Sequence, residues 1–259
     1  MKYRAIITTV ITLILSDAAV SSSVHERGGP AELFATGVEN YRNEDYREAL
    51  VNWMELYDAG YDNHDLLYNI GNAWFQMDNI AMAILFYERA LLRRPFSDEA
   101  RENLEIAGSH IRVRFTEVPP PFFRRWTDTS ALILSSDNWA LISLALFLLA
   151  LTSAMVALFL KKRGWRMVLF PAALFMIAAS SITLLLSRHN RNLVYNSRYA
   201  VVTETLVTGR SSPSETGREL FILHEGIKVK REETLGEWTE IILPDGNRGW
   251  VPRDSMESL

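Results

Sequence analysis

Residues that commonly perform catalysis are few and scattered in this sequence. The five histidines are His25, His64, His110, His189 and His224. No two have the HExxH or HxH spacing that brings two imidazoles to one metal ion. Ser211 and Ser212 lie in a turn motif and lack the GxSxG elbow that exposes a nucleophilic serine. With no glycine-rich phosphate loop or dinucleotide fingerprint either, we expect no catalytic residues, no metal, no cofactor and no enzymatic activity.

Composition excludes further classes of protein. The 259 residues include no cysteine, so the chain can form neither a disulfide nor a thiolate metal site. The formal net charge is -4, and residues 24–118 alone carry nine Lys and Arg against seventeen Asp and Glu, a balance of -8. A protein without a basic surface cannot hold many phosphates, so nucleic-acid binding is not expected.

The chain begins with features typical of a secretory signal. Lys2 and Arg4 precede a short apolar run, and small residues follow near Ser21. The strongly apolar part has about eleven residues, whereas roughly twenty are needed to cross a bilayer. Residues 1–23 are therefore predicted to be a cleaved signal peptide; the alternative is an uncleaved anchor.

Two long apolar segments predict a transmembrane hairpin over residues 138–187. Residues 139–160 contain no charge and would form a helix of roughly 33 Å, long enough to cross the hydrocarbon core. Residues 167–186 repeat this pattern, and Pro171 is expected in the first turn of that helix. The spans carry no ionisable group, which favours an anchor over a transporter.

The loop between the spans, residues 161–166, predicts how the hairpin is oriented. It reads KKRGWR, and short basic loops remain in the cytoplasm of bacteria. Both larger domains are then expected on the periplasmic side of the inner membrane, in agreement with the signal peptide. Several arginines near the outer ends of the spans, including Arg124 and Arg191, argue the other way.

A 34-residue period runs through residues 30–116. It aligns Gly37 with Gly71, Ala49 with Ala83, and Trp53 with Tyr87. Small residues at two of these positions allow two helices to cross closely, while the large aromatics fill the space beside them. This spacing and the sequence of residues 66–95 resemble the tetratricopeptide repeat family. Ser97 or Asp98 is predicted to cap a fifth helix that covers the last apolar face.

The resemblance implies a protein-binding groove lined by the first helix of each repeat. Its inner wall would carry Tyr41, Tyr68, Asn72, Phe75 and Gln76. The alternative is that aromatics such as Tyr41 and Phe75 are ordinary core residues. No lysine is present in this wall, which argues against a site for a terminal carboxylate. Two repeats are few for independent stability, so partner binding or self-association is expected to complete the domain.

Residues 117–137 join the repeats to the first span. They begin near three consecutive prolines, a stiff extended spacer. Phe122, Phe123 and Trp126 follow, interleaved with Arg124 and Arg125. This composition favours either a helix that lies on the membrane surface or a plain linker.

Residues 195–259 are predicted to form a small all-β domain. Short runs rich in Val, Ile and Thr alternate with turns, and residues 238–243 and 248–251 make a clear hairpin. The RSSPS, LHEG and PDGNRGWVP segments resemble the bacterial SH3-like family in order and spacing. Trp238 and Trp250 are candidates for a surface that binds a peptide or a cell-wall glycan, although such tryptophans often pack a barrel instead.

The full order predicts a multidomain membrane protein: tetratricopeptide hairpins, a transmembrane hairpin and an SH3-like barrel. It is similar to the BatE family of aerotolerance-operon (Bat) proteins. That resemblance implies partners among von Willebrand factor A-type membrane proteins and a MoxR-type ATPase, and a role in stress tolerance or envelope maintenance. We expect a membrane-anchored adaptor; the alternative is a cell-wall-associated factor that holds glycan or a wall hydrolase.

Overall fold

The computed structural model describes residues 29–111, 121–160 and 162–259. The predicted signal peptide, residues 112–120 with two of the three linker prolines, and Lys161 lie outside this part of the chain. The described residues form two compact units. One unit combines the N-terminal helices with residues 198–259, and the other contains the long apolar helices and the segment before them.

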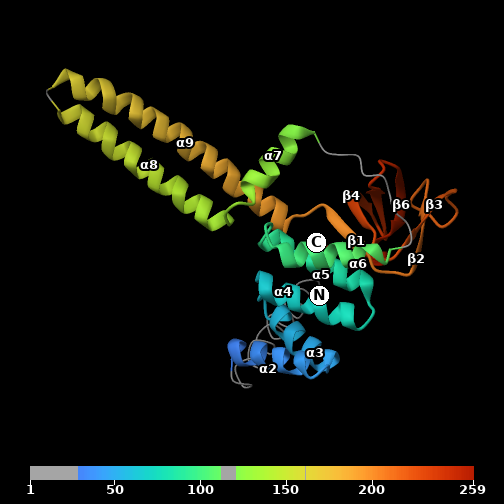
Figure 1. Cartoon of the computed structure of the whole chain (residues 1–259). Coiled ribbons are helices and arrows are strands. Elements are labelled where there is room, and N and C mark those ends of the chain that lie inside the picture. The colour runs from blue at the N-terminus through green and yellow to red at the C-terminus, as the bar shows by residue number, and fades with distance from the viewer. Residues whose placement is uncertain (1–28, 112–120, 161) are drawn as a thin grey trace, which may run out of the picture. The chain divides into compact units, whose positions relative to one another are not determined.

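The N-terminal part of the first unit consists of two helical hairpins and one further helix (Figure 1). The helices are α2 (Pro30–Arg42), α3 (Tyr46–Asp58), α4 (His64–Gln76), α5 (Ile80–Arg93) and α6 (Asp98–Ser109). Four of them begin at a side chain that accepts a hydrogen bond from the first turn, a favourable N-cap. The capping residues are Asp45, Asn63, Asn79 and Ser97.

The 34-residue period places a glycine against a large aromatic ring in both helical hairpins. A Cβ atom on Gly37 would lie 2.4 Å from the indole nitrogen of Trp53, and one on Gly71 would lie 2.7 Å from the ring of Tyr87. Both aromatic rings are almost fully buried. Glycine therefore allows each pair of helices to close around a large ring, which explains why these positions recur together.

The C-terminal part of the first unit is one antiparallel sheet. Its strands are β1 (Tyr199–Val202), β2 (Leu206–Arg210), β3 (Glu219–His224), β4 (Lys228–Leu235), β5 (Trp238–Ile242), β6 (Arg248–Pro252) and β7 (Met256–Ser258). They are arranged in the order β3-β2-β6-β5-β4-β1-β7. Buried and outward-facing residues alternate along β5 and β6, as expected for strands with one face on the core.

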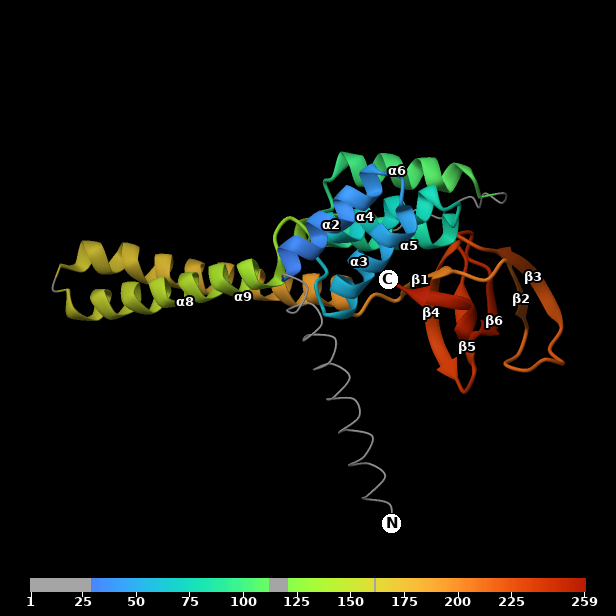
Figure 2. The ribbon, with the colours of Figure 1, turned by 90° about the horizontal axis from the view of Figure 1, so that it is seen from below.

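The sheet packs against α5, so the two parts share a core. Val201 of β1 and the C-terminal Leu259 lie in the apolar cluster of the helical hairpins, and Ile111 contacts the cores on both sides. Both views place β1 and the C-terminus beside α5 (Figures 1 and 2). The helices and the sheet therefore form one body rather than two separate modules.

The second unit contains two helices that are long and apolar enough to cross a membrane, α8 (Ser136–Phe159) and α9 (Arg163–Tyr195). They form an antiparallel hairpin (Figure 1). Most of their large apolar side chains point outward, for example Leu158 and Phe175, at 65% and 75% exposure. Such a surface favours a lipid environment over water.

Two details of this hairpin differ from the sequence-based expectation. Arg163–Arg166 were assigned to the loop, but α9 already begins at Arg163, and it continues past Leu186 to Tyr195. Pro171 consequently lies inside the helix rather than in its first turn. The charged residues extend the helix beyond the apolar run at both ends, which a hydropathy pattern cannot reveal.

Small polar residues close the contact between α8 and α9. The hydroxyl groups of Ser143 and Ser180 each donate to the other residue's carbonyl oxygen, both at 2.9 Å. Ala150, Ala157 and Ala173 are buried along the same hairpin. Close packing of small residues and paired hydroxyls stabilises helix contacts in lipid, where the hydrophobic effect contributes little.

Candidate functional site

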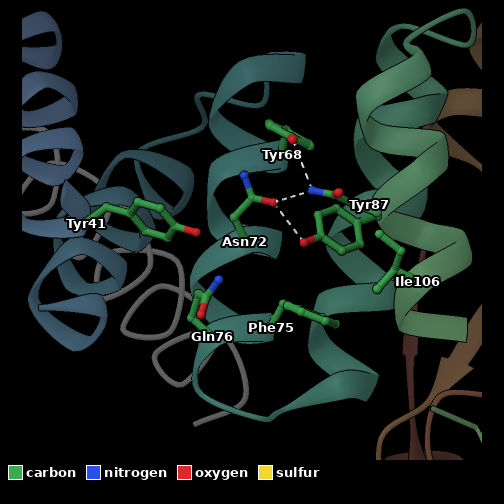
Figure 3. Close-up of a pocket in the computed structure, with 8 residues that line it drawn as sticks. Tyr41, Tyr68, Asn72, Phe75, Gln76, Tyr87 and Ile106 are labelled. Carbon is green, nitrogen blue, oxygen red and sulfur yellow. Dashed lines mark hydrogen bonds between the residues drawn. The ribbon is translucent and has the colours of Figure 1, made fainter. Parts of the chain in front are cut away.

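A hollow of about 250 Å³ opens on the helical part of the first unit. It is built from the inward sides of α2, α4, α5 and α6, so residues from both hairpins and the last helix meet there (Figure 3). Its lining residues are Tyr41, Tyr68, Asn72, Phe75, Gln76, Tyr87, Asn103 and Ile106. No lining residue carries a formal charge at neutral pH.

Asn72 is the centre of a hydrogen-bond network in this hollow. Its Oδ1 accepts from the hydroxyl of Tyr87 at 2.8 Å and from Nδ2 of Asn103 at 2.9 Å. Asn103 Nδ2 also donates to the hydroxyl of Tyr68 at 3.0 Å. In this arrangement two donors reach the Asn72 oxygen, and its NH₂ group points away from both donors (Figure 3).

Tyr41 and Tyr87 of the lining remain neutral over a wide pH range. Burial raises the pKa of Tyr87, and the nearby Tyr68 adds to the increase. Burial also raises the pKa of Tyr41, which a hydrogen bond with Gln76 partly offsets. These hydroxyls therefore act as neutral hydrogen-bonding groups rather than as acids or bases.

All five residues predicted for the groove line this one hollow. The alternative that these aromatics are ordinary core residues also has support for Tyr41. This residue is partly buried, and the centre of its ring lies 5.9 Å from that of Trp53. The sequence reasoning missed Tyr87, Asn103 and Ile106. One signal was available, because the 34-residue period carried on from Asn72 reaches Ile106. Asn103 lies outside that period and is placed only by the packing of α6 on α5.

The two tryptophan candidates of the sheet, Trp238 and Trp250, share one outward face. Trp238 pairs with Pro252, and Trp250 pairs with Glu240 on the neighbouring strand, so both side chains project from the same side. A second hollow of about 440 Å³ has Trp238, Arg210, Glu215 and Glu237 in its lining. Trp250 is not in that lining, so the two tryptophans do not meet in this hollow.

Two of the described histidines, His64 and His189, contact other groups of the fold. His64 is buried, with Nδ1 lying 3.0 Å from the carbonyl oxygen of Ala90, and His189 lies 2.6 Å from Asp128. Within residues 29–111, 121–160 and 162–259, no three His, Asp or Glu side chains gather into a group that could hold a metal ion. His25 lies outside the described residues.

The chain was compared with models of known protein families and with curated proteins. No family model matches it, and no curated protein sequence is similar to it.

Proposed function

We propose that this protein is a membrane-anchored adaptor of the tetratricopeptide type, whose groove binds an extended segment of a partner protein. The observation that carries this proposal is the orientation of the Asn72 amide in the hollow. Its oxygen is occupied by Tyr87 and Asn103, so its NH₂ group is available to donate to a ligand in the hollow. Main-chain carbonyl groups of an extended peptide are the most common acceptors of this kind in proteins.

The rest of the lining favours an uncharged segment. Phe75 and Ile106 offer apolar contact, while Gln76 and Tyr41 offer neutral hydrogen-bonding groups. A buried charge in the ligand would find no opposite charge in this lining and would incur the full cost of desolvation. Recognition would then depend on the shape of the main chain and on one apolar side chain.

The hairpin α8–α9 would hold this groove at the bacterial inner membrane. Since the helical part and the sheet share a core, both must lie on one side of the membrane, and an antiparallel hairpin returns the chain to the side it left. The basic residues between the spans favour the cytoplasm for the loop, and the groove would then face the periplasm.

The partners proposed for this adaptor come from the BatE resemblance. They are von Willebrand factor A-type Bat proteins and a MoxR-type ATPase system, in a complex linked to stress tolerance or envelope maintenance. The SH3-like domain would offer a second contact, and self-association would extend the short repeat array. The absence of a lysine in the groove is consistent with an internal segment rather than a chain terminus as the ligand.

Peptide display tests the groove directly. A random peptide library is panned against the full chain in lipid nanodiscs. The enriched peptides should be uncharged at their centre, and their affinity should fall at least tenfold with Phe75→Arg. The matched control is Val51→Arg, which places the same charge on the exposed side of α3. Equal binding by both variants would contradict the proposal.

Orientation is tested with single cysteines, since the chain contains none. Glu102→Cys in α6 and Asn247→Cys in the sheet should react with a membrane-impermeant maleimide in spheroplasts. Gly164→Cys, near the start of α9, should react only after the membrane is broken. Labelling of Gly164→Cys in intact spheroplasts would reverse the assigned orientation.

The second candidate function is retention of cell-wall glycan, and the hollow beside Trp238 favours it. An exposed indole edge next to polar groups is a common arrangement in sugar-binding sites. The full chain in nanodiscs is sedimented with purified wall sacculi, and Trp238→Ala should remove binding. Sacculi that bind both proteins equally, or neither, would exclude this candidate.

A further inference from the structure

The helix before the membrane hairpin, α7 (Phe122–Ala131), presents an aromatic face that is largely exposed. Phe122, Phe123 and Trp126 are 84%, 71% and 64% exposed. Positions 122 and 126 are one turn apart, and position 123 is adjacent on the same side, so the three rings form one continuous surface.

The opposite side of α7 is firmly attached to α9. Asp128 contacts His189 at 2.6 Å, and Asn190 donates to the carbonyl oxygens of Ala131 and Leu134 at 3.0 and 3.1 Å. Trp139 also donates to Ala131 at 3.0 Å. The helix is therefore held at one place relative to the hairpin, with its rings directed away from α9.

This attachment sets the depth of α7 relative to the bilayer. The apolar run of α9 ends at Leu186, and Asn190 lies four residues further, about 6 Å along the helix axis. Ser187 donates to the Ser136 carbonyl at 2.7 Å, so the start of α8 lies at the same level. The headgroup layer extends roughly 5–8 Å beyond the hydrocarbon core, which places the Ala131 end of α7 within it.

The direction of α7 and the charge of its arginines agree with a position in the headgroup layer. Figure 1 shows α7 running across the axis of the hairpin rather than along it, so the whole helix stays near one level. Arg124 and Arg125 accompany the rings, and Arg124 is 3.8 Å from Asp128. Among the described residues, no acidic group forms a salt bridge with Arg125.

We infer that α7 is an interfacial helix that binds the membrane surface, with its three aromatic rings among the acyl chains and Arg125 on an anionic phospholipid headgroup. Aromatic residues with flanking arginines favour this layer because the rings are amphipathic or apolar while the guanidinium attracts lipid phosphates. The inference rests on the part of the proposed function in which α8 and α9 cross a membrane. The inference adds a contact between α7 and lipid on the periplasmic surface of the membrane. This contact constrains where the chain leaves the bilayer.

Spin labels at single introduced cysteines test the inference in the full chain. A label at Phe123→Cys reports on α7. A label at Leu148→Cys reports on the lipid-facing side of α8, and a label at Glu102→Cys reports on the water-exposed side of α6. Each protein is reconstituted in vesicles containing phosphatidylethanolamine and phosphatidylglycerol. Accessibility of the label to oxygen, which is concentrated in lipid, is compared with accessibility to a water-soluble nickel chelate.

The label at position 123 should be more accessible to oxygen than to nickel, at a shallower depth than the label at position 148. In these anionic vesicles, Arg125→Gln should shift the label at position 123 toward lower oxygen accessibility and higher nickel accessibility. The same substitution should have no effect in vesicles of phosphatidylcholine alone.

Two results would overturn the inference. One is a position 123 label as accessible to nickel as the label at position 102. The other is a label shielded from both reagents, which indicates a protein contact. If the label at position 148 is also accessible to nickel, the membrane-spanning hairpin itself is wrong, so failure of the anchor is distinguishable from failure of α7.

Discussion

Lys228 of the sheet places its Nζ 2.7 Å from Oε2 of Glu88 in α5. The two residues are 140 positions apart, and this ion pair joins the first and last parts of the chain outside the apolar hairpin. Arg89, next to Glu88, donates to the Ser258 carbonyl, and burial lowers the pKa of its guanidinium. An ion pair and a buried cation thus flank the apolar contact between α5 and the sheet.

Reversal of one charge in this pair should weaken the shared body. Lys228→Glu places two carboxylates together and should cost about 1–2 kcal/mol, since the Lys228 side chain is partly exposed and screened. The melting temperature of the first unit should fall by several degrees, measured by circular dichroism. The double exchange Glu88→Lys with Lys228→Glu should recover most of the loss. The exposed Glu105→Lys is the control, and an equal effect there would show that the pair contributes nothing specific.

Gly71 should tolerate no side chain. Alanine at this position would place its Cβ 2.7 Å from the ring of the buried Tyr87, and overpacking of this kind costs about 1–3 kcal/mol. Gly108 is the matched control, because no atom lies within 4 Å of the Cβ added there, and Gly108→Ala should stabilise α6 by up to about 1 kcal/mol. Urea unfolding measures both changes, and two substitutions of the same sign would refute the packing argument.

Alkaline pH should destabilise the helical part through Tyr87. Its pKa is raised above the ordinary value near 10, so the folded state holds the phenolic proton more tightly than the unfolded state. The corresponding stability is complete below pH 10 and is lost as pH rises toward the folded pKa. Denaturant unfolding at a series of pH values should give a declining free energy above pH 10. Tyr87→Phe should make that decline shallower, and an unchanged slope would remove Tyr87 as its cause.

Ser180 and Ser181 should respond oppositely to the same substitution. Ser180 is buried against Ser143, whereas Ser181 is exposed on the outer surface of α9. Ser180→Leu should separate α8 from α9 and destabilise the hairpin by about 1–3 kcal/mol. Ser181→Leu should be neutral or stabilising in lipid. Unfolding by titration with dodecyl sulfate in mixed micelles distinguishes them, and equal losses would contradict the assigned contact.

Local patterns in the sequence predicted much of the helical architecture. The pairing of Gly37 with Trp53 and of Gly71 with Tyr87 follows from one repeated spacing. Ser97 and Asp98 were both candidates for the cap of the last helix, and the structure has Ser97 in that position. The groove candidates, Tyr41 and Phe75 among them, came from the tetratricopeptide resemblance, which implies that the first helix of each repeat lines a groove. Short-range rules suffice where the structure itself repeats.

Contacts between distant segments could not be predicted in this way. Nothing near Glu88 indicates that it meets Lys228, and nothing near Asn103 indicates that it donates to both Asn72 and Tyr68. The start of α9 at Arg163 was also missed, because hydropathy records where apolar residues end and not where a helix begins. Tertiary packing determines the Glu88–Lys228 ion pair, the hydrogen bonds of Asn103 and the start of α9.

We propose that the groove around Asn72 binds a protein partner at the membrane, and photocrosslinking in native membranes is the test of this binding. A benzophenone amino acid replaces Gln76, which is exposed at the groove, or Val51 on α3 as the control. We predict a discrete crosslink to a membrane protein at position 76 that is absent at position 51 and is lost with Phe75→Arg. Identical products at both positions, or a product that persists with Phe75→Arg, would contradict the account.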